Sequence, residues 1–217
     1  MAISDLLKEI HDQRPFVKED YLKNIFSWQE LENLLNLRPF ISVKRFFILN
    51  DKEYNWPIHG WLSDINTFPS SLIDEEIQNN LCYLADCSRV NSKVNAICGD
   101  LEKVTNGAAD AHIYFDLSVS GFIPLQVHWD KSHNFIVQIE GQTKWKVWDI
   151  KVDKDGPSRT SRLTEISCLD VMMNPGDVIF IPAYHWHYAQ SETKRLSISF
   201  PFSTKYEDKE DRHWIKL

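Results

Sequence analysis

The stretch PLQVHWDKSHNFIVQIEGQTKW, residues 124–145, decides how the rest of the chain is interpreted. It contains His128-Trp129-Asp130 within an apolar run rich in β-forming residues. Because side chains alternate between the faces of a strand, His128 and Asp130 share one face. An imidazole and a carboxylate on one face are two of the three ligands in the facial triad that holds non-haem Fe(II). The candidate for the third is His187, in NPGDVIFIPAYHWHYAQ, residues 174–190.

The composition favours one globular domain. The chain has 217 residues, of which 43% are apolar and 12% aromatic, so a sizeable core can form. A net charge of −7 and a pI near 5.6 argue against broad nucleic-acid binding. We expect no transmembrane helix and no secretory signal, and hence a cytoplasmic protein. No C-x-x-C occurs, which predicts reduced thiols at Cys82, Cys87, Cys98 and Cys168.

The pattern changes from helical to β near residue 110. Apolar residues at helical spacing predict helices over 3–12, 27–35, 73–87 and 92–107, with an early strand over 41–49. Ser27 followed by Glu30 is a capping box. Short apolar or alternating runs, separated by Gly, Pro, Asn and Asp, predict later strands. These cover 112–119, 124–130, 134–141, 144–150, 169–174, 177–183 and 195–202.

We therefore predict a mainly β fold with N-terminal helices, in a single domain over 1–217. A helical half with the early strand would take 1–109, a barrel core 110–203 and a charged tail 204–217. Many short strands with inward-facing ligands are typical of a double-stranded β-helix, the jelly-roll barrel of the cupins. The mouth of such a barrel can hold a metal and a small cosubstrate.

The pattern alone leaves other assignments open. His133 and His185 lie close to the candidate ligands, and either could replace one of them. His128 and His187 are also compatible with ordinary packed or surface histidines. The tryptophans of the β half are more typical of barrel packing than of a substrate cage, and they are Trp129, Trp145, Trp148 and Trp186.

Residues 129–148 and 174–190 together resemble the JmjC-type cupin hydroxylases, most closely their ribosomal-oxygenase branch. Residues 26–40 are similar to that branch's N-terminal helix, and 98–118 to the helix and strand before its metal triplet. The resemblance implies an oxygenase that uses Fe(II), 2-oxoglutarate and O2 to hydroxylate a side chain, releasing succinate and CO2. The substrate would be a protein, a peptide or an amino-acid-like molecule. The iron ligands and catalytic residues would be His128, Asp130 and His187.

The resemblance also implies residues around 2-oxoglutarate. Tyr114 matches a tyrosine that lines the pocket, although the asparagine two residues before it in the family is His112 here. Asn134 matches a polar position near the cosubstrate. The family's basic residue, which pairs with the far carboxylate, falls at Thr143, and Lys144 lies next to it on the opposite face of a regular strand.

A buried carboxylate needs a cation, so another anchor is expected. Arg195 and Ser197 share one face of the last predicted strand, and other 2-oxoglutarate oxygenases use an Arg-x-Ser pair there. Arg195 with Thr143 could therefore replace the missing base. A shift in strand register would instead make Lys144 the anchor, and Arg195 could also face solvent.

Two other functional classes remain open from the sequence. One is a metal-binding cupin enzyme that does not use 2-oxoglutarate, which the threonine at position 143 keeps in consideration. The other is a non-catalytic cupin that binds a ligand or partner, against which the three retained ligand types argue. The oligomeric state is also open, with a homodimer as one option.

Overall fold

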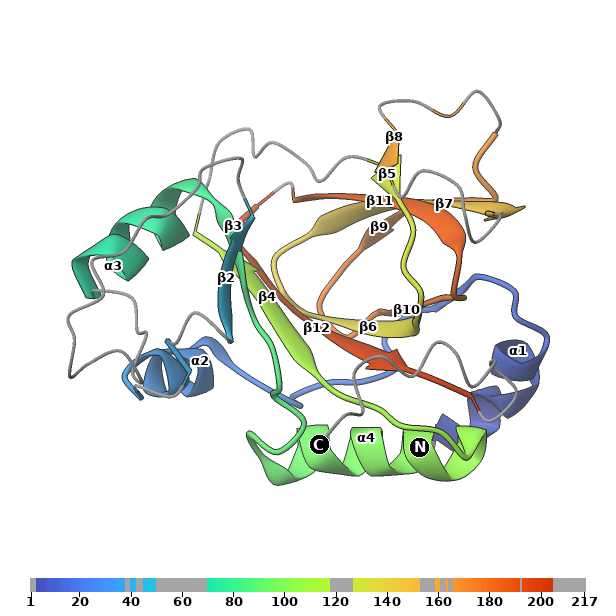
Figure 1. Ribbon diagram of the computed structural model, residues 1–217, viewed down its shortest axis with the longest axis horizontal. Coiled ribbons are helices and arrows are strands. Elements are labelled where there is room, and N and C mark those ends of the chain that lie inside the picture. Colours follow the sequence, from blue (N-terminus) through green and yellow to red (C-terminus); the bar gives the residue numbers. More distant parts are fainter. Residues whose placement is uncertain are drawn as a thin grey trace, which may run out of the picture.

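Two antiparallel sheets face each other and enclose a barrel (Figure 1). The computed structural model describes residues 3–37, 40–41, 45–49, 70–117, 127–152, 159–160, 163, 166–191 and 193–204. The larger sheet has seven strands in the order β1 (Phe16–Lys18), β10 (Val178–Ile181), β6 (His133–Glu140), β12 (Arg195–Phe202), β4 (His112–Asp116), β3 (Leu81–Leu84) and β2 (Phe46–Leu49). The smaller sheet has five, in the order β8 (Arg159–Thr160), β5 (Val127–His128), β11 (His185–Ser191), β7 (Thr143–Lys151) and β9 (Leu169–Met173). The predicted jelly-roll fold is confirmed.

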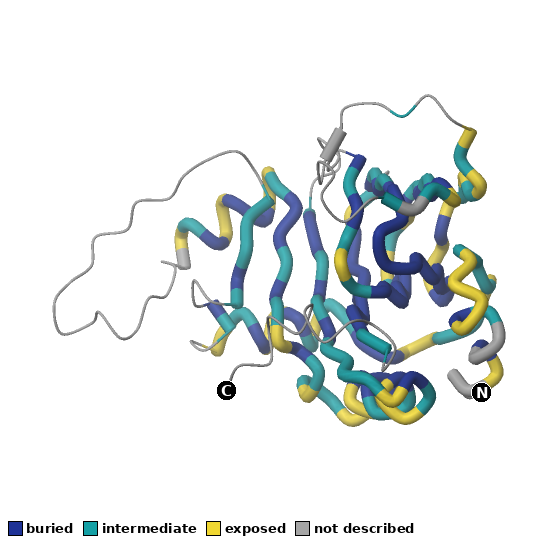
Figure 2. Tube along the Cα trace, turned by 45° about the vertical axis from the view of Figure 1, so that its right-hand side comes forward, coloured by how far each residue is buried: buried dark blue, intermediate teal, exposed yellow. Residues whose placement is uncertain are grey.

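The two faces of the seven-stranded sheet have different surroundings: one packs against the apolar core under the helices, and the other faces the inside of the barrel. Along β12, Leu196 and Ile198 lie in the main apolar core, whereas Arg195, Ser197 and Ser199 turn to the inside of the barrel. Both faces of this strand are covered, so all eight of its residues are buried. The buried positions are concentrated in the sheets, and exposed positions lie mainly on the outer helices and turns (Figure 2).

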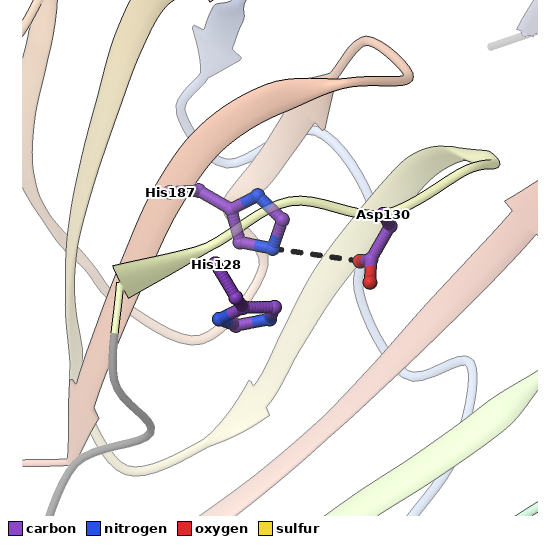
Figure 3. Close-up of side chains that lie close together, drawn as sticks. All are labelled: His128, Asp130 and His187. Carbon is purple, nitrogen blue, oxygen red and sulfur yellow. Dashed lines mark ion pairs between the residues drawn. The ribbon is translucent and has the colours of Figure 1, made fainter. Parts of the chain in front are cut away.

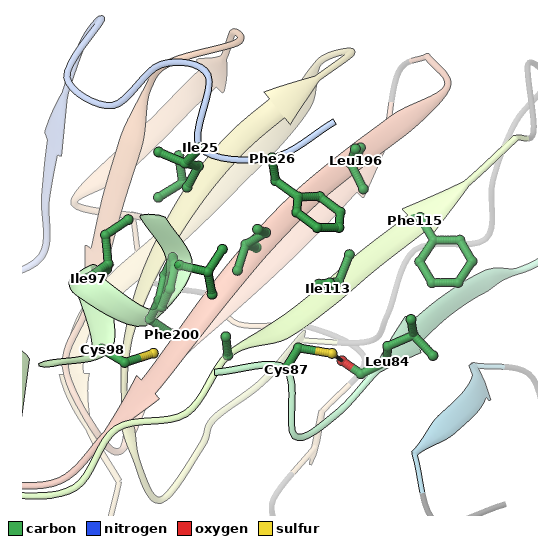
Figure 4. Packing of buried hydrophobic residues seen from close by; sticks show 14 of the residues in the cluster. Ile25, Phe26, Leu84, Cys87, Ile97, Cys98, Ile113, Phe115, Leu196 and Phe200 are labelled. Atoms are coloured by element: carbon green, nitrogen blue, oxygen red, sulfur yellow. Dashed lines mark hydrogen bonds between the residues drawn. The ribbon is translucent and has the colours of Figure 1, made fainter. Parts of the chain in front are cut away.

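Helices cover the outer face of the larger sheet. They are the 3₁₀ turn η1 (Ile3–Leu6) and the helices α1 (Leu7–His11), α2 (Trp28–Leu35), α3 (Ser70–Asn79) and α4 (Ser92–Thr105). Helix α4 directs Ile97 and Cys98 into the core beside Phe200 of β12 (Figure 4). None of the helices described combines the length and apolar character that a membrane span requires. All four cysteines are free, as expected, and only Cys168 among them is exposed.

The predicted capping box starts α2. The backbone N–H of Glu30 donates to Ser27 Oγ at 3.3 Å, and that hydroxyl donates to Glu30 Oε2 at 2.9 Å. The predicted helix 92–107 ends earlier, at Thr105, because Asn106 adopts a left-handed conformation with φ 53°. Asparagine tolerates this region better than other non-glycine residues, so Asn106 ends the helix before Gly107.

The predicted helix 73–87 is wrong over its second half. Helix α3 ends at Asn79, and residues 81–84 form strand β3 between β2 and β4. Leu81, Cys82 and Leu84 are buried there, so sheet pairing overrides a local spacing that also fits a helix. Residues 42–44 of the predicted early strand lie outside the described residues, as do 118–119, 124–126 and 205–217 of the predicted strands and tail.

Gly141 forms the turn between β6 and β7 and lies against the start of β12. Its φ is 70°, and a Cβ added there would be 1.8 Å from the carbonyl oxygen of Lys194. A side chain at this position would meet fixed backbone and adopt a strained dihedral angle. Glycine therefore allows the hairpin turn to pack next to the strand that carries Arg195.

We predict that Gly141→Ala lowers the free energy of unfolding by roughly 2–3 kcal/mol, because it adds backbone strain and a steric clash. Gly99→Ala is the matched control: Gly99 is within α4, and an added Cβ there meets nothing within 4 Å. It should raise stability by up to about 1 kcal/mol. Urea denaturation of both variants measures the difference, and equal stabilities would contradict the packing described for the turn.

Candidate metal centre

Strands β5 and β11 bring His128, Asp130 and His187 together (Figure 3). The two histidines are direct partners across the antiparallel pair, and their ring centroids are 4.3 Å apart. Asp130 follows β5 by two residues, and its Oδ2 is 3.5 Å from His187 Nε2. One potential ligand atom from each of the three residues lies within 4.8 Å of the others. His187 is far from His128 and Asp130 in sequence, and the pairing of β11 with β5 brings it to them.

Hydrogen bonds orient the cluster for a cation. His187 Nδ1 lies 2.9 Å from the carbonyl oxygen of His185, to which it donates, and this contact directs Nε2 toward Asp130. Asn134 Nδ2 donates to Asp130 Oδ2 at 2.7 Å. The Ser199 hydroxyl donates to Asn134 Oδ1 at 3.2 Å, which sets the orientation of that amide.

The electrostatics also favour a charged carboxylate at Asp130. Burial by itself would raise the pKa of Asp130. The hydrogen bond and charge of His187, together with His128 and Asn134, outweigh burial and lower the pKa to about 2. Two imidazoles and an ionised carboxylate fit the donor set of the facial triad for Fe(II).

A pocket extends from the metal ligands to Arg195. Its lining combines charged and polar side chains with apolar ones from Ile136, Trp145 and Ala189. It is lined by Tyr114, His128, Asp130, Asn134, Ile136, Trp145, His187, Ala189, Arg195 and Ser199.

Arg195 is a buried cation, since only 4% of the residue is exposed. Its Nε donates to Ser197 Oγ at 3.2 Å, and its guanidinium carbon lies 5.8 Å from the centre of the Tyr114 ring. Burial lowers the pKa of Arg195, whereas Asp116 and Tyr114 counteract this effect. Of the two options from the sequence, an inward-facing and a solvent-facing Arg195, the structure shows the first.

Two buried polar atoms of β7 have no hydrogen-bond partner among the residues described. They are Thr143 Oγ1 and Trp145 Nε1. The two side chains point to the same face of β7, because they are two residues apart. Buried polar atoms are almost always paired in folded proteins, so unpaired ones indicate a place for a polar ligand or water.

The structure places Lys144 away from the pocket. It lies on the outer face of β7, where its Nζ is 3.5 Å from Asp170 Oδ1, and it is partly exposed. The strand pairing is regular here, with Lys144 opposite Met172 and Gln190. The register shift that would turn Lys144 inward does not occur, so Lys144 does not line the pocket as that alternative requires.

The other histidines considered from the sequence are not in the cluster. His133 packs against both Phe180 and Phe202, and its Nδ1 accepts a hydrogen bond from the backbone N–H of Ala183. His185 Nε2 lies 3.3 Å from Asp149 Oδ1, outside the lining of the pocket. These side chains support the fold around the site.

The tryptophans divide between packing and the pocket. Three of them, Trp129, Trp148 and Trp186, pack in a separate apolar cluster. Trp145 packs between the two sheets and also lines the pocket.

One polar residue was missed in the sequence. Asp116 is fully buried directly opposite Arg195 in the β4–β12 pair. Its spacing of two residues from Tyr114 was the available signal, because it places both side chains on the same face of one strand.

Comparison with known proteins identifies the family. The family model for the JmjC domain matches residues 89–209, which is more than half of the 217 residues. The chain belongs to the JmjC domain family. The resemblance noted in the sequence is therefore confirmed, and both metal-ligand segments of this JmjC chain lie within the matched region.

Several relatives resemble the chain over most of its length. JmjC domain-containing protein D of Dictyostelium discoideum is 22% identical over 92% of this chain and 50% of that protein. The bifunctional lysine-specific demethylase and histidyl-hydroxylase NO66 of Caenorhabditis briggsae is 24% identical over 85% of this chain and 24% of that protein. The structure of YcfD, a ribosomal oxygenase from Escherichia coli in complex with cobalt and 2-oxoglutarate, covers 94% of this chain and 52% of its own, with a TM-score of 0.60 and 17% identity. The chain spans about half the length of these relatives or less.

We predict that His187→Ala abolishes stoichiometric binding of a divalent cation such as Mn(II), because it removes one of three ligands. His185→Ala is the matched control, since His185 is on the same strand, is also buried and pairs with Asp149. Its backbone carbonyl remains available to His187 in the variant. Titration calorimetry measures both, and unchanged affinity in His187→Ala would contradict the assignment.

Proposed function

We propose that this chain is an Fe(II)- and 2-oxoglutarate-dependent oxygenase that hydroxylates a side chain of a protein, peptide or amino-acid-like substrate. The observation that supports it best is the arrangement of one pocket, with a triad of metal-binding residues at one end and a buried guanidinium at the other. A small molecule with a chelating end and a distant carboxylate matches this arrangement. 2-Oxoglutarate has both groups.

When bound, iron and 2-oxoglutarate supply the oxidation: O2 provides one oxygen atom to the substrate C–H bond and one to succinate, with loss of CO2. The protein residues bind and orient the reactants. His128, Asp130 and His187 would hold the cation through two nitrogens and one oxygen, and all three residues line the pocket. Asn134 and Ser199 keep the Asp130 carboxylate in place.

The polar residues at the far end would bind the second carboxylate. Arg195 offers a planar set of N–H donors, and its bond to Ser197 fixes the direction of the guanidinium. The unpaired hydroxyl of Thr143 can donate to the same carboxylate. Tyr114 flanks the guanidinium and lines the pocket. Apolar walls from Ile136 and Ala189 would limit water between the two ends.

The buried arginine also argues against a metal enzyme that takes no dicarboxylate. A guanidinium is costly to bury; Asp116 offsets part of that cost from β4, and an anionic ligand in the pocket would offset more of it. The names of related proteins support a protein substrate, since one is a histidyl-hydroxylase and another a ribosomal oxygenase. The chemical nature of the pocket supports the cosubstrate more directly than it supports any one substrate.

We expect the iron-loaded protein to convert 2-oxoglutarate slowly to succinate and CO2 without substrate. Incubation with Fe(II), ascorbate and 2-oxoglutarate labelled at C1 should release labelled CO2. Asp130→Ala, which removes a metal ligand, should reduce release to the background rate. If the iron-loaded protein neither binds nor decarboxylates 2-oxoglutarate, the proposed function is refuted.

The anchor can be tested separately. A charge-assisted hydrogen-bonded contact is worth roughly 1.5–3 kcal/mol. Since each 1.4 kcal/mol is tenfold in affinity, Arg195→Ala should weaken 2-oxoglutarate binding by at least about tenfold. Lys144→Ala is the control and should change it little, because Lys144 pairs with Asp170 on the outer face. The opposite result, with Lys144 essential and Arg195 dispensable, would disprove the assigned anchor.

A further inference from the structure

Asp116 lies on the strand that pairs with β12, at the position opposite the proposed anchor, Arg195. Strand β4 pairs with β12 so that Asp116 is opposite Arg195, on the face that turns inside the barrel. Asp116 is fully buried. The Ser191 hydroxyl donates to its Oδ2 at 3.1 Å, whereas its Oδ1 has no hydrogen-bond partner among the residues that the structure describes.

This arrangement creates a conflict of charge when a dicarboxylate binds. Without a ligand, the positive charge of Arg195 is the opposite charge that acts on Asp116. A ligand carboxylate at Arg195 would bring a second negative charge to the same buried guanidinium. Two carboxylates that share one cation in a poorly solvated site cannot both remain ionised without a large electrostatic cost.

We propose that Asp116 takes up one proton from solvent when a dicarboxylate occupies the Arg195 end of the pocket, so that cosubstrate binding is coupled to proton uptake. In this role Asp116 is a positioning residue that acts through Arg195. The inference deepens the proposed function and rests on it for the nature of the ligand. The neutral acid removes the competing charge, and Arg195 can then pair with the ligand.

The pKa of Asp116 is already close to neutral pH before a ligand binds. Burial raises the pKa of Asp116 to about 6, although Arg195 and the Ser191 hydroxyl act in the opposite direction. A ligand that neutralises Arg195 cancels its contribution and adds repulsion. The pKa of Asp116 must therefore rise further in the complex.

The other ionisable groups around β4 do not account for the same uptake. Cys82 of β3 is a buried thiol whose pKa is raised by burial, so it is neutral before and after binding. Burial likewise raises the pKa of Tyr114 and keeps the phenol neutral. Glu76 of α3 is buried and accepts a hydrogen bond from Asn80, so it is the carboxyl group that a control must address.

The coupling has a defined sign. The complex binds the proton more tightly than the free protein does, so affinity for a dicarboxylate is greatest below pH 6, where Asp116 is already protonated. Above that pH affinity falls, by up to about tenfold per pH unit, until the pH reaches the pKa of Asp116 in the complex.

Calorimetric titration of the Mn(II)-loaded protein tests this directly. 2-Oxoglutarate and glutarate are titrated at pH 7 in buffers of different ionisation enthalpy, which gives the number of protons taken up. Glutarate lacks the 2-oxo group that chelates a metal, so it isolates the carboxylate end. We expect uptake approaching one proton for wild type with either ligand, and uptake near zero for Asp116→Asn. Affinity in Asp116→Asn should be independent of pH between 6 and 8.

Glu76→Gln is the matched control and should retain the proton uptake of the wild type. If Asp116→Asn does not fold, the number of protons that the wild-type protein takes up on binding decides, because a value near zero overturns the coupling. Uptake that persists in a folded Asp116→Asn protein, or is lost in Glu76→Gln, overturns the assignment to Asp116. Binding that is coupled to proton uptake but gives no decarboxylation would support this inference and would refute only the proposed oxygenase function. Failure to bind either dicarboxylate would refute both.

Discussion

The alternation of side chains along β12 is the constraint on which both the core and the pocket depend. Leu196 and Ile198 face the helices, while Arg195 and Ser197 face the barrel. A shift of one residue would exchange the two faces along the whole strand. It would place a guanidinium in the apolar core and remove the cation from the pocket, and each change is costly. The neighbouring strands β4 and β6 hold the register by pairing on both sides.

The same strand connects the two ends of the candidate site. Arg195 stands at the proposed carboxylate end, and Ser199, four residues later, supports the metal end through Asn134 and Asp130. Since β12 is paired on both sides, these side chains have fixed separations along a rigid element. The distance between the metal-binding end and the guanidinium is therefore set by backbone geometry, and a cosubstrate must match it.

Local patterns in the sequence were sufficient for much of this structure. Local runs identified β4, β5, β6, β7, β9, β10 and β12, but not β8 or β11, the strand that carries His187. The spacing of His128 and Asp130 identified two of the clustered residues. Segment 81–84 was assigned to a helix because its apolar spacing is ambiguous, and only its neighbours β2 and β4 resolve the ambiguity. The choice between Arg195 and Lys144 depended on strand register. The role of Asp116 depends on Arg195, which is 79 residues later in the chain (195 − 116) and lies opposite it only through strand pairing.

The position of β12 in the sheet has a consequence for how the chain folds. It is the last strand in the described part of the chain, yet it lies between β6 and β4 near the middle of the larger sheet. During synthesis from the N-terminus, β3 and β4 are made long before the strand that joins them to β6 and β10. The two halves of this sheet cannot unite until β12 has been made. Folding of the barrel must therefore be a late, non-local event, which predisposes the nascent chain to slow folding and to exposure of unpaired strand edges.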